Sequence, residues 1–129
     1  MKYLLDTHTL LWMFLRSSEL TKKIRLVLAD TGNQLSVSAA STWEISIKAA
    51  IGKLRLPGEP GQYIPDRLDR AGISTLAIVA EHTYGVARLP MHHTDPFDRL
   101  IISQAQCEGL TIVTHDKNFA RYDVKVLAF

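Results

Sequence analysis

Two aspartates of this chain, Asp6 and Asp116, follow short apolar runs that are typical of strands. The run at 3–5 leads directly into Asp6, and the run at 110–114 ends two residues before Asp116. Open parallel α/β sheets bind ligands at the carboxyl edge of their strands, so we expect both carboxylates at that edge, where they can share a cation. The alternative for each is an Asx turn or a helix cap, the commoner role of a lone aspartate after a strand.

A glutamate, Glu44, falls on the apolar side of a predicted helix. At about 100° per residue, Ala40, Ile47 and Ile51 lie within about 60° of it around the helix axis. A carboxylate among apolar side chains is costly unless its charge is paired or binds a metal. A salt bridge to Lys48, one turn later, is the alternative, worth about 0.2–0.5 kcal/mol. The sequence leaves both interpretations open.

An acidic pair opens a later predicted helix, within the stretch 94–99 (TDPFDR). Pro96 suits the first helical position, which makes Asp95 the expected N-cap and puts Asp98 in the first turn. Capping and the helix dipole favour acids at both positions, so structural chemistry alone can explain them. The coincidence with two strand-end aspartates and a glutamate on an apolar face favours a shared function instead.

Four carboxylates gathered in one place would repel one another, and some would stay protonated, unless divalent cations lay between them. Mg²⁺ or Mn²⁺ is the expected cation, because hard ions take carboxylate and water oxygens. The five histidines show no spacing typical of a zinc site. We expect His92 and His93 on a solvated loop, whereas His8 and His115 lie close enough in sequence to the proposed ligands to contact substrate.

The elements that must position these acids alternate between strand and helix. This alternation predicts an α/β fold, a three-layer sandwich with a mostly parallel central sheet flanked by helices. Hydrophobic periodicity and the breakers Gly52, Gly72 and Gly109 set the expected boundaries. Strands are predicted at 3–5, 35–37, 73–76, 110–114 and 124–127, and helices around 10–15, from a cap at Ser18 to the turn at 31–33, and at 39–51, 63–71, 78–87 and 96–108.

Length and composition bound the class of protein. The chain has 129 residues, 47% hydrophobic, with 15 Lys and Arg against 13 Asp and Glu. This indicates one domain, 1–129, whose net charge of +2 argues neither for nor against a nucleic-acid partner. The single cysteine, Cys107, cannot form an internal disulfide, and no apolar run approaches the roughly 20 residues of a membrane span. We therefore expect a cytoplasmic protein without a membrane partner.

Taken together, these segments resemble a known family, the PIN-domain ribonucleases, and within it the VapC toxins of bacterial toxin–antitoxin pairs. The likeness covers essentially the whole chain, and the order and spacing of its motifs are highly specific. It is carried by the segments 3–8 (YLLDTH), 38–45 (SAASTWEI), 52–54 (GKL), 93–99 (HTDPFDR) and 113–116 (VTHD).

Carried over residue by residue, the resemblance implies an acidic quartet that serves as the catalytic and metal-binding set. Asp95 either shapes the helix start or reaches a metal through water. Thr7 and Thr114 match hydroxyl positions beside the acids and are expected to support them. Arg99 and Lys117 are expected to contact RNA phosphates. The quartet consists of Asp6, Glu44, Asp98 and Asp116.

The resemblance also implies an activity and partners. One or two Mg²⁺ or Mn²⁺ ions would activate water for endonucleolytic cleavage of RNA, with transfer or ribosomal RNA as the expected substrates. Asp6 and Asp98 are the expected direct ligands, while Glu44 and Asp116 would complete the shell directly or through water. A toxin of this kind binds a VapB-like antitoxin and commonly forms a homodimer. The consequence of cleavage would be inhibition of translation and growth.

Three other classes of protein also place acidic residues at the ends of strands. Phosphatases with an aspartyl nucleophile need a second aspartate two positions after the first, where this chain has His8. A receiver domain needs an acidic pair near the end of its first strand, and Leu5–Asp6 is not such a pair. The alternative that stays open is a non-catalytic PIN-like module that binds RNA or an antitoxin and uses its acids structurally.

Surface chemistry follows from separating the quartet from the remaining charges. Without those four acids, 15 basic residues face 13 − 4 = 9 acidic ones, so the rest of the chain carries +6. A metal-filled quartet would therefore lie in a basic protein suited to phosphate. Trp12, Met13 and the segment 54–56 are candidates for exposed apolar surface, with core packing as the alternative for each.

Overall fold

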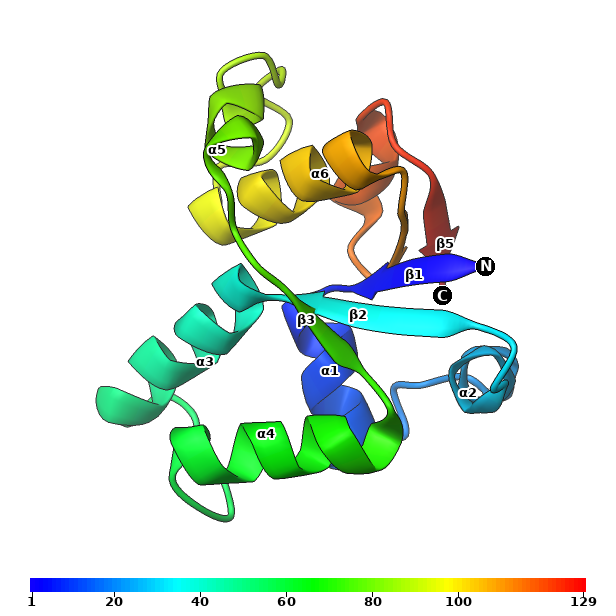
Figure 1. Cartoon of the computed structure of the whole chain (residues 1–129), viewed down its shortest axis with the longest axis vertical. Coiled ribbons are helices and arrows are strands. Elements are labelled where there is room, and N and C mark those ends of the chain that lie inside the picture. Colours follow the sequence, from blue (N-terminus) through cyan, green and yellow to red (C-terminus); the bar gives the residue numbers. More distant parts are fainter.

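The centre of the protein is a five-stranded parallel sheet with the strand order β3-β2-β1-β4-β5 (Figure 1). The computed structural model describes residues 1–129. All four neighbouring strand pairs are parallel, so the predicted, mostly parallel sheet is confirmed and is fully parallel. The strands are β1 (Lys2–Leu5), β2 (Gln34–Ser38), β3 (Ser74–Leu76), β4 (Thr111–Thr114) and β5 (Val126–Ala128).

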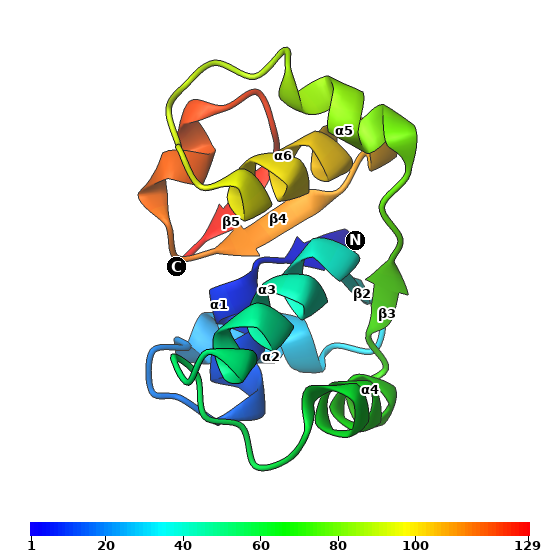
Figure 2. The same cartoon turned by 90° about the vertical axis from the view of Figure 1, so that its left-hand side faces the viewer.

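Helices cover both faces of this sheet, which confirms the three-layer α/β architecture (Figures 1 and 2). One face carries α1 (Thr7–Phe14), α2 (Lys22–Ala29), α3 (Ala39–Ala50) and α4 (Pro60–Ala71). The other carries α5 (Ala80–Val86), α6 (Pro96–Glu108) and a short 3₁₀ helix, η1 (Lys117–Arg121). No helix combines the length and the apolar character that crossing a membrane would require.

Alternation of side chains along the strands divides the core in two. Leu5 and Val113 belong to the larger cluster, which packs with α1 to α4. Leu4 and Ile112, their neighbours in sequence, belong to the smaller cluster beneath α6 and η1. Both faces of the strands are therefore buried, which explains why these runs are continuously apolar.

Helix boundaries differ from the prediction in three places, and in the first of them α1 begins at Thr7, capped by Asp6, rather than near residue 10. The second helix begins at Lys22 and is capped by Thr21, whose hydroxyl accepts from the amide of Ile24, so the predicted cap at Ser18 is wrong. α4 begins at Pro60, three residues earlier than predicted, because Glu59 caps it. In each case a nearer capping side chain and, for α4, a proline suited to the first turn set the boundary.

Residues proposed as exposed apolar surface contribute to the core instead. Trp12, Met13, Leu54 and Leu56 are partly buried and pack against the larger cluster. The core-packing alternative is therefore the correct one for these side chains. Large apolar side chains that do face solvent include Leu15, Leu26 and Trp43, with 48%, 64% and 59% of their surface exposed.

The strand order reverses between β1 and β4. From β1 the chain proceeds outward to β2 and β3, and it returns to the other side of β1 with β4 and β5. Leu5 is aligned with both Val37 of β2 and Val113 of β4, so these three strands end at the same level. Such a switch point is where open parallel sheets form a crevice at their carboxyl edge.

Candidate active site

Asp6 follows β1 at the switch point and is 96% buried, with 4% of its surface exposed. Its Oδ1 accepts from the amide of Thr9 at 2.8 Å and caps α1, while its Oδ2 accepts from the Thr114 hydroxyl at 2.5 Å. Asp6 therefore lies at the carboxyl edge, as predicted, and it also caps a helix, which was its alternative role. Capping consumes only part of the lone pairs of the carboxylate, which leaves acceptor capacity for a cation.

Thr114 links the two strand-end aspartates. Its hydroxyl donates to Asp6 and accepts from the backbone amide of Asp116 at 2.9 Å. Asp116 in turn caps η1 through Oδ1, which accepts from the Asn118 amide at 2.9 Å. The expectation that Thr114 supports the acids therefore agrees with its contacts, because this one buried hydroxyl bonds the carboxylate of Asp6 and the backbone of Asp116.

Thr7 makes a contact that the sequence pattern did not reveal. Its buried hydroxyl donates to Oγ of Ser41 at 2.9 Å, which joins the start of α1 to the first turns of α3. Ser41 lies three residues before Glu44, so this bond fixes the helix that carries the glutamate. The serine is found only once the two helices are known to lie side by side.

Glu44 is buried, with 5% of its surface exposed, and it also forms the salt bridge that was its alternative role. The Lys48 ammonium lies 2.8 Å from its Oε2, and this hydrogen bond raises the pKa of Lys48. The predicted neighbours are partly wrong: Ala40 is buried, but Ile47 and Ile51 are exposed. Because Ile47 and Ile51 are exposed, the predicted apolar stripe does not account for the burial of Glu44.

Asp95 is the N-cap of α6, as predicted. Its Oδ1 accepts from the amides of Phe97 and Asp98, at 2.8 and 3.2 Å. The following first turn directs Asp98 to the same region as the strand-end acids, and 20% of the Asp98 side chain remains exposed. Asp95 therefore has a demonstrable structural role, while Asp98 is free of capping duties.

Burial raises the pKa of Asp98 to about 7. The negative charges of Asp95, Asp6 and Glu44 act in the same direction, whereas His93 lowers the pKa. These acids are thus close enough for their charges to interact, although they belong to segments that are far apart in the sequence. A carboxyl that is half protonated at neutral pH is the expected result of gathering acids without a cation between them.

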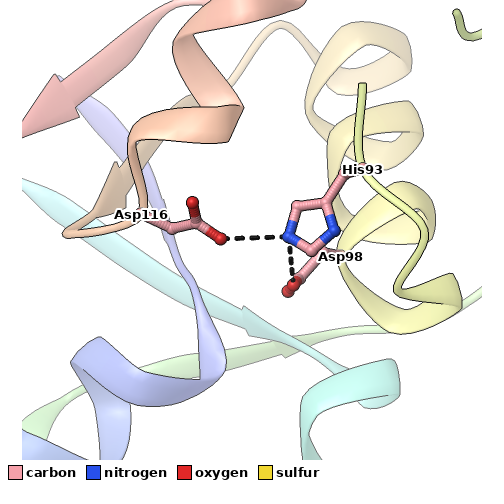
Figure 3. Close-up of side chains that lie close together, drawn as sticks. All are labelled: His93, Asp98 and Asp116. Carbon is pink, nitrogen blue, oxygen red and sulfur yellow. Dashed lines mark hydrogen bonds and ion pairs between the residues drawn. The ribbon is translucent and has the colours of Figure 1, made fainter. Parts of the chain in front are cut away.

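His93 lies within this site. It is on a loop, as predicted for it and for His92, but only 15% of its side chain is exposed, so the predicted solvation is wrong. Its Nε2 is 3.0 Å from Oδ2 of Asp98 and 3.0 Å from Oδ2 of Asp116 (Figure 3). The three residues offer ligand atoms within 4.8 Å of one another. The loop before α6 brings His93 to Asp116, 23 residues later in the chain, which local sequence could not indicate. Its position two residues before Asp95 was the one available signal.

Arg99 does not contact solvent as an RNA-binding residue would, so its predicted role needs correction. Only 8% of its surface is exposed, and its guanidinium donates to the carbonyls of Val86, Leu89, Pro90 and His93. It also reaches the Tyr122 hydroxyl at 3.4 Å. These bonds hold the connector between α5 and α6 in place, and with it His93.

Residues predicted to meet substrate lie on the open side of the site. Lys117, in the first turn of η1, is exposed one residue after Asp116. His8 and His115 are also exposed, and with Trp12 they line a pocket of about 230 Å³ next to Asp6 and Asp116. The Nδ1 atom of His115 contacts the backbone oxygen of Phe129. These positions are compatible with the expected contacts to substrate.

The fold and this group of acids define a family. The PIN domain family matches residues 3–125, so the chain belongs to the PIN-domain proteins. Ribonuclease VapC16 of Mycobacterium tuberculosis is 37% identical over 67 residues, which cover 52% of this chain and 48% of that protein. The match thus spans about half the length of this curated relative. The predicted family membership is confirmed.

Solved structures agree on the fold. VapBC2 from Rickettsia felis, bound to a promoter DNA fragment, has a chain with a TM-score of 0.75 at 19% identity, covering 100% of this chain and 99% of that one. The DNA-bound VapBC of Salmonella typhimurium gives 0.70 at 16% identity, covering 99% and 98%. FitAcB from Neisseria gonorrhoeae gives 0.64 at 22% identity, covering 97% and 96%. Likeness at these identities concerns the fold.

Proposed function

We propose that this chain is a metal-dependent endoribonuclease, the toxin of a VapBC-type module, which cleaves transfer or ribosomal RNA and so inhibits translation and growth. The observation that carries the proposal is the convergence of acidic side chains at the sheet's switch point, expressed in the pKa of Asp98 near 7. Its curated relative is named a ribonuclease, which supports the same reaction class.

The residues present suit Mg²⁺ or Mn²⁺. Oxygen is the only donor type in the quartet of Asp6, Glu44, Asp98 and Asp116, and hard divalent ions prefer oxygen. Bound there, one or two such ions would supply Lewis acidity, lowering the pKa of a water and stabilising charge on the phosphate. The same Oδ2 atoms that contact His93 are among those a cation would take.

The chain's own residues would hold and orient this chemistry. Asp6 and Asp98 would bind the ion directly, with Glu44 and Asp116 completing the shell directly or through water. Thr114 holds the Asp6 carboxylate through one hydrogen bond and the backbone of Asp116 through another. These contacts preorganise the oxygens before substrate arrives, which limits the reorganisation needed during the reaction.

The decisive experiment compares the purified chain with Asp6→Asn on total cellular RNA, with Mg²⁺ or Mn²⁺, and maps new ends by sequencing. We expect the natural chain to produce discrete ends, and the variant to produce none while keeping its far-ultraviolet dichroism. Asp123→Asn, an exposed aspartate, is the matched control and should cleave normally. Cleavage that persists in excess EDTA, or no cleavage of any RNA tested, would instead favour the non-catalytic module. Unchanged cleavage by folded Asp6→Asn would contradict the metal site.

For partners we propose a VapB-like antitoxin and a homodimer. The similar structures are of VapBC complexes, which supports the first. A pocket of about 370 Å³ beside α1 and α2 also supports it, since apolar Met13, Leu20 and Leu28 lie there with Arg16 and Arg25. An acidic segment with apolar anchors would suit such a surface. Light scattering of the free chain tests the homodimer, and a monomer mass would contradict it.

A further inference from the structure

A pocket with ring-bearing walls adjoins the proposed metal site. It measures about 230 Å³, and its five lining residues are Asp6, His8, Trp12, His115 and Asp116. Two of these are members of the acidic quartet, contributed by the ends of β1 and β4. The other three carry aromatic rings. The pocket is therefore lined by carboxylates on the side of the proposed metal site and by aromatic rings next to them.

Trp12 is the fixed part of this pocket. It lies four residues after His8 on α1, so the two rings share a helix face, with centroids 5.8 Å apart. The His115 ring lies 5.6 Å from Trp12, and Phe129 lies 6.1 Å from it. Trp12 is partly buried against the larger core cluster, while both histidines are exposed. The partly buried indole therefore lies beside two exposed, polar rings at the rim.

These properties identify the kind of ligand. The carboxylates would repel a bare anion, so a phosphate would reach this edge only through a cation, and the adjoining space must accept a neutral group. A nucleobase is such a group: it is flat and stacks on aromatic side chains, while imidazole nitrogens can bond its polar edge. A base paired within a duplex has both faces covered and could not enter.

We propose that the pocket of His8, Trp12 and His115 is a nucleobase-binding site that receives an unpaired base next to the phosphate at the quartet. The inference rests on the proposed nuclease function and deepens it, because it specifies that one base of the RNA substrate stacks on Trp12. Trp12 is then a residue that determines affinity and strand preference, whereas the quartet determines whether cleavage occurs.

The chain contains two tryptophans, which provides a matched control. Trp43 also lies near the site, one residue before Glu44, with its ring 5.2 Å from Phe97 of α6. It is 59% exposed and does not line the pocket. Trp43→Phe leaves Trp12 as the sole fluorophore, and Trp12→Phe leaves Trp43.

Both single-tryptophan variants are titrated with adenosine 5′-monophosphate and with ribose 5-phosphate in the presence of Mg²⁺. We expect the monophosphate to quench Trp12 in a saturable way, ribose 5-phosphate to leave Trp12 unchanged, and neither compound to affect Trp43. Quenching confined to Trp43, equal responses to both compounds, or no saturable response of Trp12 would overturn the proposal. This readout needs no cleavage, so it is independent of the test of the nuclease function.

A second measurement uses cleavage kinetics on a single-stranded RNA. Removal of one stacking side chain typically weakens binding by about 5- to 150-fold, so Trp12→Leu should raise KM within that range, with a smaller rise for Trp12→Phe. Mg²⁺ affinity measured by calorimetry should be unchanged in both folded variants. An unaltered KM in Trp12→Leu would overturn the proposal and leave the nuclease intact.

Discussion

Asp98 differs from the other acids of the site in how it holds its charge. Asp6 and Asp116 each cap a helix, and Glu44 is paired with Lys48. Asp98 has no such backbone partner, and burial with neighbouring negative charges raises its pKa to about 7. Its carboxyl is therefore the group whose protonation responds most directly to pH and to a cation.

This pKa predicts that Asp98 destabilises the metal-free fold at high pH. The pKa of the folded carboxyl lies above that of the unfolded chain, so its protonated form favours folding, and that stability is lost as pH rises from about 4 through about 7. Asp98→Asn should thus raise the free energy of unfolding at pH 8 by on the order of 2 kcal/mol, with little change near pH 4. Urea denaturation at both pH values measures this.

Asp123→Asn, which removes an exposed aspartate, is the control and should be neutral at both pH values. If the stability difference between Asp98→Asn and the natural chain did not vary with pH, Asp98 would have an ordinary pKa.

Metal affinity should depend on pH in the opposite sense. A cation must displace the proton of Asp98, so affinity for Mg²⁺ or Mn²⁺ is expected to rise with pH and to level off above about 7. Below that value, competition by one proton lowers affinity by about tenfold per pH unit. Calorimetric titration between pH 5.5 and 8 tests this, and a constant affinity over that range would contradict it.

Thr114 offers a test of how the strand-end acids are held. Thr114→Val keeps the shape of the side chain but removes the hydroxyl that donates to Asp6 and accepts from Asp116. We expect metal affinity and cleavage to fall by about 10- to 100-fold, as for other groups that orient metal ligands. Thr114→Ser, which retains the hydroxyl, should keep most of both. Equal losses in the two variants would indicate that packing of the methyl group matters instead.

At the scale of elements, the site depends on where strands and helices end. β1 and β4 are adjacent although more than 100 residues lie between them in sequence, and Asp6 directly follows β1 while Thr114 ends β4. α3 contributes Glu44 from its second turn and α6 contributes Asp98 from its first turn, near the helix starts that face the carboxyl edge. The connector before α6 closes the arrangement by bringing in His93.

Arg99 is expected to stabilise that connector. Its guanidinium serves four backbone carbonyls and a hydroxyl, a set that a lysine ammonium with three donors cannot replace. Arg99→Lys should lower the free energy of unfolding by about 2–3 kcal/mol. Arg121→Lys, an exposed substitution, is the control. Equal denaturation midpoints for the two variants would show that these bonds contribute little.

At the scale of the whole molecule, a small net charge conceals an uneven distribution. The chain carries +2 overall, and +6 when the quartet is set aside. Divalent cations bound at the quartet would neutralise its negative charge, so RNA would then meet a predominantly basic protein. Lys117 lies at the carboxyl edge of the sheet, whereas Lys2 lies at the start of β1, on the opposite edge.

This distribution predicts that RNA binding weakens with salt and that Lys117, near the site, contributes to this dependence. If two or three phosphates are neutralised, raising salt from 50 to 200 mM should weaken binding by about tenfold. Lys117→Gln should reduce that dependence, and Lys2→Gln should not. Fluorescence anisotropy with labelled RNA, in an Asp98→Asn background that prevents cleavage, measures both slopes. Equal slopes for the two lysine variants would exclude Lys117 as a phosphate contact.

The sequence by itself determined the strand and helix order, because hydrophobic period and breakers act over a few residues. It also predicted the acidic set that we propose for the site, since apolar runs precede Asp6 and Asp116 and Pro96 puts Asp98 in a first turn. The predicted cap at Ser18 failed because competition between neighbouring caps depends on small energy differences.

Tertiary structure decided the remaining roles, because they arise from contacts between distant segments. His93 joined the site, Arg99 turned inward to backbone carbonyls, and Ser41 met Thr7 across two helices. Trp12 acquired a place beside Asp6 and Asp116 through the adjacency of β1 and β4. A residue's type limits the chemistry it can perform, but its neighbours in space decide whether that capacity serves packing, support or reaction.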